Sequence, residues 1–300
     1  MRAWKAIAAV LALAPSLVGA QSLEPRLYLP LPTGLSAVVV SYTHLQGAVV
    51  VDAALPITDF RATLNMGAVG FAHAFGLSGR SAQLQVVAPF ASGTARAVVA
   101  GQDTTRELRG PADPQLRLGV NVLGAPARRR SELAGVRFGT MVGVSLAVTL
   151  PLGHYDTDRR LNIGANRWAL KPEVALVEPL GGGWALEGYG GIWLFGRNSA
   201  YLDTATVTQD PLWSLQGHLI RLFARRAWVA LDAALVSGGA TSVDDVPQSN
   251  FQRNSRVGAT AAWFLGHGHS LKAAFATGVY TRFGGDFTVF SLGYQYGWGG

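Results

Sequence analysis

Residues 285–298, the closing segment of the chain, alternate between large apolar residues and small or polar ones. The large members are Phe290, Leu292, Tyr294, Tyr296 and Trp298. Alternation with a period of two places the two kinds of residue on opposite faces of a β-strand. Bulky aromatic residues on one face and small polar residues on the other are typical of a transmembrane barrel wall, which has lipid outside and water or packed polar groups inside.

Composition indicates the same environment. The chain has 300 residues, of which 49% are hydrophobic and 14% are charged, whereas about a quarter of a soluble chain is charged. After residue 20, no run approaches the roughly 18–20 consecutive apolar residues that a spanning helix needs. A closed β-barrel is the other structure that satisfies its backbone within lipid. The apolar content excludes disorder, and the lack of cysteine excludes a disulfide scaffold or a zinc–cysteine site.

The amino terminus has the pattern of a secretory signal peptide. Arg2 and Lys5 precede an apolar stretch at 6–13, and Val18-Gly19-Ala20 supplies the small residues of a cleavage site. We expect residues 1–20 to be removed after Ala20, which leaves 21–300 as a single barrel domain. The formal charge of +7 falls by the two lost cations to 7 − 2 = +5. Export to the bacterial outer membrane is the predicted localisation.

The same alternation recurs along the mature chain and predicts an all-β protein, a transmembrane antiparallel β-barrel of about twelve strands. The expected strands are 35–44, 61–75, 80–90, 113–123, 139–150, 167–180, 184–197, 212–223, 226–237, 253–264, 269–281 and 285–298. Long connections are expected at 45–60, 91–112, 151–166, 198–211 and 238–252, with tight turns between. Short periplasmic turns, longer extracellular loops and an even strand number are the topology of such barrels.

Most expected strands carry a charged residue on the face opposite their apolar residues. A Lys or Arg at the bilayer midplane costs roughly 2–4 kcal/mol on the lipid face, so we assign these residues to the lumen. The inward set comprises Arg61, Arg117, Arg167, Lys171, Arg256 and Lys272, with Glu173, Glu187 and Asp232. Two interpretations stay open: a charged constriction that favours anions, or ion pairs that fill a narrow lumen.

Aromatic residues fall into two groups. Tyr189, Trp193 and Phe195 share the inward face of their strand with Glu187, and we interpret them either as a path for aromatic solutes or as internal packing. The others lie near strand ends, where girdle residues meet the bilayer interface. The girdle set includes Trp184, Trp213, Trp228, Trp263, Tyr280, Tyr294, Tyr296 and Trp298.

Few residues suggest chemistry. His267 and His269 form a pair too small for a metal site. Ser214 and His218 lie four residues apart on one strand face, about 13 Å from each other, which is too far for a nucleophile and its base. We therefore expect no catalytic residue, no metal and no cofactor.

Two further polar stretches are expected to lie in a loop or a turn. Arg167, Asn162 and Asn166 adjoin a predicted loop, where they either bind a small ligand or cation or order the loop through hydrogen bonds. The run at 128–130 is read as a solvated turn beside anionic lipid, with no role in binding nucleic acid.

Several stretches resemble the transporter-like outer-membrane family named for the MetA pathway of phenol degradation. They are Arg26–Gly34, Asp113–Pro126, Pro151–Asp156, Asn162–Trp168, Lys171–Glu173, Gln209–Pro211 and Gly293–Tyr296, which together span nearly the whole mature chain. The resemblance implies an outer-membrane barrel that takes up aromatic or other small hydrophobic compounds, and it implies no catalytic residues.

Passive uptake of small solutes is therefore the expected function. The alternative is a structural or adhesive barrel with a plugged lumen and ligand-binding loops, and a lipid-active enzyme is a more distant one. Expected partners are outer-membrane lipid and lipopolysaccharide, the barrel-assembly machinery, and a small hydrophobic or aromatic solute.

Overall fold

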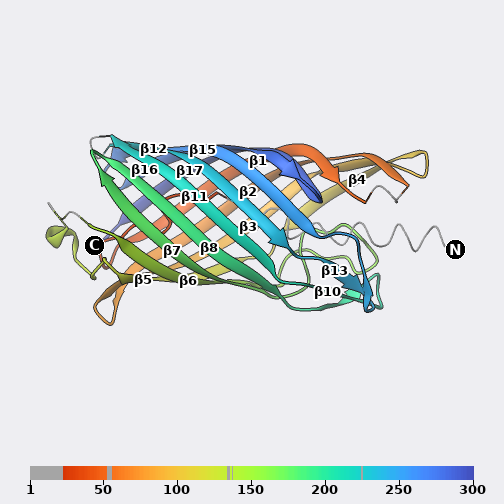
Figure 1. The fold of residues 1–300 in the computed structure, drawn as a ribbon, viewed down its shortest axis with the longest axis horizontal. Helices are drawn as coiled ribbons and strands as arrows, with labels where there is room; N and C mark the ends of the chain where they lie inside the picture. The colour runs from red at the N-terminus through yellow and green to blue at the C-terminus, as the bar shows by residue number, and fades with distance from the viewer. Residues whose placement is uncertain (1–22, 53–55, 134–135, 137, 224–225) are drawn as a thin grey trace.

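The computed structural model describes residues 23–52, 56–133, 136, 138–223 and 226–300, so the predicted signal peptide lies outside the described residues. The chain forms a tilted antiparallel barrel whose long axis is horizontal in Figure 1. The wall strands are β1 (Ser36–Val50), β2 (Ile57–Leu77), β3 (Arg80–Val99), β4 (Gln102–Pro111), β5 (Gln115–Leu123), β6 (Met141–Thr149), β7 (Ala169–Gly181), β8 (Trp184–Phe195), β11 (Leu212–Phe223), β12 (Ala227–Gly238), β15 (Gln252–Gly266), β16 (His269–Thr281) and β17 (Gly284–Trp298).

The barrel closes because β1 pairs with both β17 and β2, and β2 pairs with β3. Strands β4 and β5 both pair with β3, so together they make one wall position. The interruption between them follows Pro111 and contains Pro114, and proline cannot donate to a strand ladder. The wall therefore has twelve positions, which confirms the predicted fold class.

The two ends of the barrel differ. Tight turns such as 78–79 and 267–268 gather at the end where the chain terminates, together with the short helix η1 (Arg130–Glu132) (Figure 1). The longer connections gather at the other end, where β9 (Asn198–Tyr201), β10 (Ala205–Gln209), β13 (Thr241–Val243) and β14 (Val246–Pro247) form a small second sheet. Following the topology of outer-membrane barrels, we name these the periplasmic end and the outer end.

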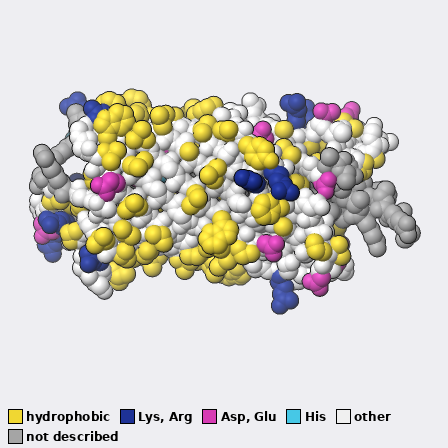
Figure 2. Space-filling view, in the orientation of Figure 1, with side chains coloured by type: hydrophobic (Ala, Val, Ile, Leu, Met, Phe, Trp, Pro, Cys, Tyr) yellow, Lys and Arg dark blue, Asp and Glu magenta, His cyan; other side chains and the backbone are white. Residues whose placement is uncertain are grey.

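The outer face of the wall is apolar. Leu231, Val279 and Trp213 are 65%, 64% and 60% exposed. Hydrophobic side chains cover the middle of the barrel in Figure 2, while charged side chains gather mostly toward its two ends. This belt is the surface that hydrocarbon would cover. Among the described residues, no helix is long and apolar enough to cross a membrane.

Two expected loops, 45–60 and 91–112, are mostly strand. Strand β1 continues to Val50, and β3 pairs with β4 in a long hairpin at the outer end. Arg61 and Arg96 are exposed on the outward face of this region, next to inward-facing, buried Ala62 and Ala95. The prediction that Arg61 faces the lumen is therefore wrong. It assumed a lipid-covered wall, whereas here the inward face is an apolar core that includes Phe60, Ala62 and Ala95, and the charged residues face outward.

The chain before β1 folds back into the barrel. Residues 23–35, named here the lumen segment, contact side chains of β3, β5, β6, β8 and β11. The segment ends at the periplasmic end, where the Thr33 amide donates to the Arg128 carbonyl. It therefore occupies the barrel interior, and its first described residue, Leu23, reaches β15, where its side chain lies 2.7 Å from the position of a Cβ atom added at Gly258.

Candidate functional site

The lumen segment is held by hydrogen bonds that alternate with ion pairs. The Glu24 carboxylate lies 2.6 Å from the Arg117 guanidinium, and the Glu24 amide donates to Gln216 over 3.2 Å. The Arg26 amide donates to Glu187 over 2.8 Å, and its guanidinium lies 3.5 Å from the same carboxylate. These contacts join residues 93 to 192 positions apart in the chain. The lumen segment is therefore held in the barrel by contacts with defined wall residues.

Tyr28 is a buried side chain of the segment, at 2% exposure. Its hydroxyl donates to Glu173 over 3.0 Å and lies 2.7 Å from the Ser145 hydroxyl. Its ring meets Tyr189 edge-on, with ring centroids 5.1 Å apart. A Cβ atom added at Gly143 would lie 2.3 Å from the Tyr28 ring, so the glycine provides the space for the ring.

The remaining inward charges are mostly paired. Lys171 and Glu173, two residues apart on β7, form an ion pair of 2.5 Å. The Asp232 carboxylate lies 2.7 Å from His218 Nδ1 and accepts a hydrogen bond of 2.6 Å from Thr260. Buried charges of this kind are stable only with such partners. These pairs fit the interpretation of ion pairs that fill part of the lumen.

Two predicted lumen cations have no ion-pair partner among the described residues, although Lys272 lies within electrostatic range of Glu24, Glu187 and Asp232. Arg256 and Lys272 form no ion pair within 4.0 Å with any of the described acidic residues; Arg256 instead donates to the Phe287 carbonyl over 3.4 Å. Lys272 lies 6.0 Å from the Trp228 ring centroid, yet it is exposed. Because Trp228 is buried within the barrel, this exposure indicates water-accessible space beside β16. Trp228 is therefore a lumen residue and its prediction as a girdle residue is wrong.

Tyr189, Trp193 and Phe195 all lie on the inward face of β8. The Trp193 and Phe195 rings stack with centroids 6.4 Å apart. Cations cover them: Lys171 Nζ is 5.6 Å from the Trp193 centroid, and the Arg167 guanidinium is 4.8 Å from that of Phe195. Tyr189 donates to Glu187 and contacts Tyr28. The three rings are thus covered by the protein's own groups.

At the outer end, the predicted polar cluster orders the loops. Asn162 donates to the carbonyls of Asp156 and Arg159 over 3.0 and 2.8 Å, and Asn166 donates to Asn198 over 2.9 Å. Asp113 accepts from the amides of Gly153 and Ala165, both over 2.7 Å. Burial raises the pKa of Asp113, although these hydrogen bonds oppose the shift. The loop-ordering interpretation of the asparagines therefore agrees with the geometry.

Arg167 lies at the junction of these loops with β7. Its guanidinium donates to Gln209 through Nη2, while buried Nη1 has no hydrogen-bond partner. The side chain is 6% exposed, and burial lowers its pKa to about 10. The cation remains charged at neutral pH, with part of its hydrogen-bonding capacity unused.

The residues weighed for chemistry have structural contacts. Ser214 donates to the Gly191 carbonyl over 3.4 Å, and His218 pairs with Asp232. His269 Nδ1 lies 2.5 Å from the Tyr294 hydroxyl. In the part of the chain that the structure describes, no three His, Cys, Asp or Glu residues cluster as metal ligands.

Sequence reasoning predicted Arg117, Glu173 and Glu187 as lumen residues but missed the segment that they bind. Glu24, Arg26 and Tyr28 precede the first alternating stretch, and Ser145 and Thr260 are small polar residues with no charge to signal them. The available signal was the pair of opposite charges, Glu24 and Arg26, within a stretch rich in leucine and proline between the cleavage site and the first strand. These features together define a β-barrel of the outer-membrane class with a polar, partly filled lumen.

Comparisons with known proteins agree with this class. The model of a family described as "Putative MetA-pathway of phenol degradation" matches residues 42–292. The chain belongs to this family, as the resemblance predicted. No curated protein matches the sequence.

Solved structures share the fold. A crystallised outer-membrane channel from Pseudomonas putida F1 has a TM-score of 0.75 and 22% identity, covering 92% of this chain and 100% of its own. The β-domain of the Bordetella autotransporter BrkA has a TM-score of 0.53 and 13% identity, covering 88% and 99%. The transport unit of the Escherichia coli autotransporter AIDA-I has a TM-score of 0.52 and 7% identity, covering 98% and 97%. At these identities, the likeness is one of fold.

Proposed function

We propose that this protein is an outer-membrane channel for the passive uptake of small solutes, including aromatic or other hydrophobic compounds. The observation that carries the proposal is that the lumen is only partly filled. The lumen segment packs against strands such as β6 and β7, whereas Lys272, on β16, points inward and is still exposed to water. The family description, which names phenol degradation, supports aromatic compounds as the solute class.

The unpaired cations of the lumen favour anions. Arg117, Lys171 and Arg26 each have a carboxylate partner, so their fields are largely cancelled. Arg256 and Lys272 have none among the described residues, and unpaired cations lining a pore attract anions. On this proposal, the signal peptide delivers the chain to the assembly machinery, and lipid and lipopolysaccharide surround the apolar belt.

Planar-bilayer recording of the refolded mature protein tests the proposal. We expect steady conductance steps and a reversal potential under a salt gradient that shows anion preference. Lys272→Gln combined with Arg256→Gln should move the reversal potential toward zero or cation preference. Arg61→Gln is the matched control, because this arginine is exposed on the outward face and should leave the reversal potential unchanged.

Heat-modifiable gel mobility shows that the protein is folded. If such protein gives no conductance steps in the bilayer, the proposal of an open channel for ions is refuted. That result would favour the structural or adhesive barrel, whose lumen only braces the wall. Equal effects of Arg61→Gln and of the Lys272→Gln, Arg256→Gln double substitution would place the selectivity outside the lumen and refute the role given to Arg256 and Lys272.

A further inference from the structure

The outer face of the barrel wall carries a groove that the channel proposal does not use. It holds about 670 Å³ of space, and its walls are almost entirely apolar. Trp184 and Arg221 lie at one end of it, whereas Phe275 and Phe290 lie toward the other. We name it the outer-face groove.

Alanines on the outward face of the wall form the floor of the groove. Ala261 on β15 pairs directly with Ala273 on β16, and Ala259 follows on the same face of β15. Phe275 and Phe290 pair directly with each other beside this floor, and both side chains are exposed. Small side chains beside large ones leave a depression in the wall, and this depression is open to the surrounding membrane.

The groove runs from the periplasmic end of the apolar belt toward the middle of the membrane. The outward residues Arg221, Val229, Ala261 and Ala273 follow one another in direct register across it. Arg221 lies near the periplasmic end of β11, whereas Phe290 lies near the middle of β17. Neighbouring strands are about 4.8 Å apart, so the four steps from β11 to β17 span roughly 19 Å. One leaflet of hydrocarbon is about 15 Å thick, half of a core of about 30 Å, so an acyl chain can lie along the groove.

Arg221 is a cation at the periplasmic end of the groove. Its guanidinium lies 5.3 Å from the Trp184 ring centroid and 5.8 Å from that of Phe223. It donates a hydrogen bond to the Gly182 carbonyl in the β7–β8 turn. None of the described acidic residues forms an ion pair with it within 4.0 Å. Because a guanidinium has five N–H donors, Arg221 keeps donors for a ligand.

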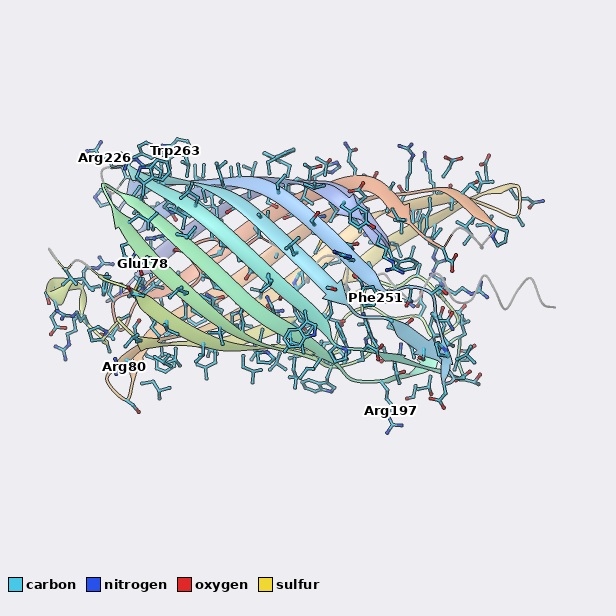
Figure 3. All side chains as sticks on the ribbon, viewed as in Figure 1. Arg80, Glu178, Arg197, Arg226, Phe251 and Trp263 are labelled. Carbon is cyan, nitrogen blue, oxygen red and sulfur yellow. The ribbon has the colours of Figure 1, made fainter. Side chains whose placement is uncertain are left out.

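Arg226 adds positive charge near this end of the groove. Its amide donates to the carbonyl of Phe223, which lines the groove, and its side chain is exposed. Figure 3 shows Arg226 at the same corner of the barrel as Trp263. Glu178, on β7, is two strands away from β11 and accepts a hydrogen bond from Thr140 over 2.6 Å. This end of the groove therefore suits a head group with a net negative charge.

We infer that the outer-face groove binds an anionic glycerophospholipid of the inner leaflet, with its phosphate on Arg221 and one acyl chain along the alanine floor. A guanidinium recognises phosphate through charge-assisted hydrogen bonds. The Trp184 ring places the guanidinium at the level of the head groups, because tryptophan in barrels marks the bilayer interface. The periplasmic position favours a phospholipid over lipopolysaccharide, which occupies the outer leaflet. The inference goes beyond the channel proposal and rests only on the placement of the barrel in the outer membrane.

Native mass spectrometry of the detergent-refolded mature protein tests the inference, because it counts the lipids bound to each chain during a titration. The probes are dipalmitoyl phosphatidylglycerol and dipalmitoyl phosphatidylcholine, which share their acyl chains and differ in head-group charge. We expect one saturable phosphatidylglycerol per chain, bound about tenfold tighter than phosphatidylcholine. Arg221→Gln should remove the difference between the two lipids. Glycerol phosphate, which has the head group without the chains, should not displace the lipid.

Two matched controls separate the site from general effects. Arg80→Gln removes the same charge from the same end of the barrel, where Arg80 is exposed and lies on the other side in Figure 3. Ala261→Leu fills the floor and should weaken both lipids about tenfold. Ala233→Leu makes the same change at an exposed position of β12 that does not line the groove. Each variant is first checked for heat-modifiable mobility, and the wild-type comparison of the two lipids needs no variant.

Equal affinity for the two lipids would overturn the inference, as would an equal loss of preference in Arg80→Gln. Equal binding by the Ala261→Leu and Ala233→Leu proteins would refute the role of the floor. Displacement by glycerol phosphate at equal concentration would refute the role of the acyl chain. A mass of two chains that Ala261→Leu abolishes would show that a second copy covers the groove, and would overturn the lipid assignment. Conductance is a separate measurement, so each of these results leaves the channel proposal standing.

Discussion

Gly143→Ala tests whether Tyr28 holds the lumen segment in place. The added methyl group would lie 2.3 Å from Cδ1 and 2.9 Å from Cε1 of the Tyr28 ring. The nearest wall atom that would constrain it is the Asn121 side-chain oxygen at 3.0 Å, so the ring must move. Movement of the ring strains its hydrogen bonds to Glu173 and Ser145 and its edge contact with Tyr189.

Overpacking of this kind costs about 1–3 kcal/mol, and about 1.4 kcal/mol is a tenfold change in an equilibrium constant. The displaced state of the lumen segment should therefore become roughly 5- to 150-fold more populated. The chain has no cysteine, so Ser145→Cys provides a unique thiol that Tyr28 covers. Its labelling rate with a small thiol reagent should rise by that factor, and channel conductance should rise with it.

Gly188→Ala is the matched control, because a Cβ atom at Gly188 would meet nothing within 4 Å. It makes the same chemical change in a wall strand without touching the segment. Both substitutions are compared in the Ser145→Cys background, which cancels the effect of the thiol itself. Equal labelling rates in the two proteins would refute the reasoning that Tyr28 seats the segment at Gly143.

Two further predictions concern buried carboxylates. Asp232→Asn weakens the hydrogen bonds from His218 and Thr260. It should lower the free energy of unfolding by about 2 kcal/mol, measured as a lower urea midpoint. Asp103→Asn, at an exposed position, should leave the urea midpoint unchanged. Asp113→Ala leaves the Gly153 and Ala165 amides without their acceptor, so hydrogen exchange there should accelerate about tenfold or more. Because burial raises the pKa of Asp113, the folded loops hold a proton at a pH where the unfolded chain has lost it, so their opening free energy should rise as pH falls through this range. A fall would contradict the assignment.

The strands could be predicted because each one carries its own signal. Along β12, Leu231 faces lipid and Asp232 faces the lumen, so neighbouring residues already report the two environments. The same logic placed eight of the nine charged candidates on inward faces and failed at Arg61. There the strand extends beyond the apolar belt, and outward polar residues no longer cost energy.

The lumen segment could not be predicted in the same way. Its partners are single residues on separate strands, such as Glu187 for Arg26 and Glu173 for Tyr28, at sequence separations of 161 and 145. No sequence periodicity links such pairs, because each pair forms only where the tertiary fold brings its two residues together. Arg167 shows a related limit: its type and position were visible in the sequence, but the lack of a partner for Nη1 is a property of the folded loops.

The lumen segment also explains why selectivity and conductance should vary separately. The segment brings one negative charge, Glu24, against Arg117 and one positive charge, Arg26, against Glu187. Its displacement would uncover one cation and one anion on the wall, so the net charge of the lumen wall would not shift toward either sign. Arg256 and Lys272 would still have no ion-pair partner among the described residues, and Lys272 would lose the nearby negative charge of Glu24. The Gly143→Ala channel should therefore pass more current while keeping the anion preference of the unaltered protein.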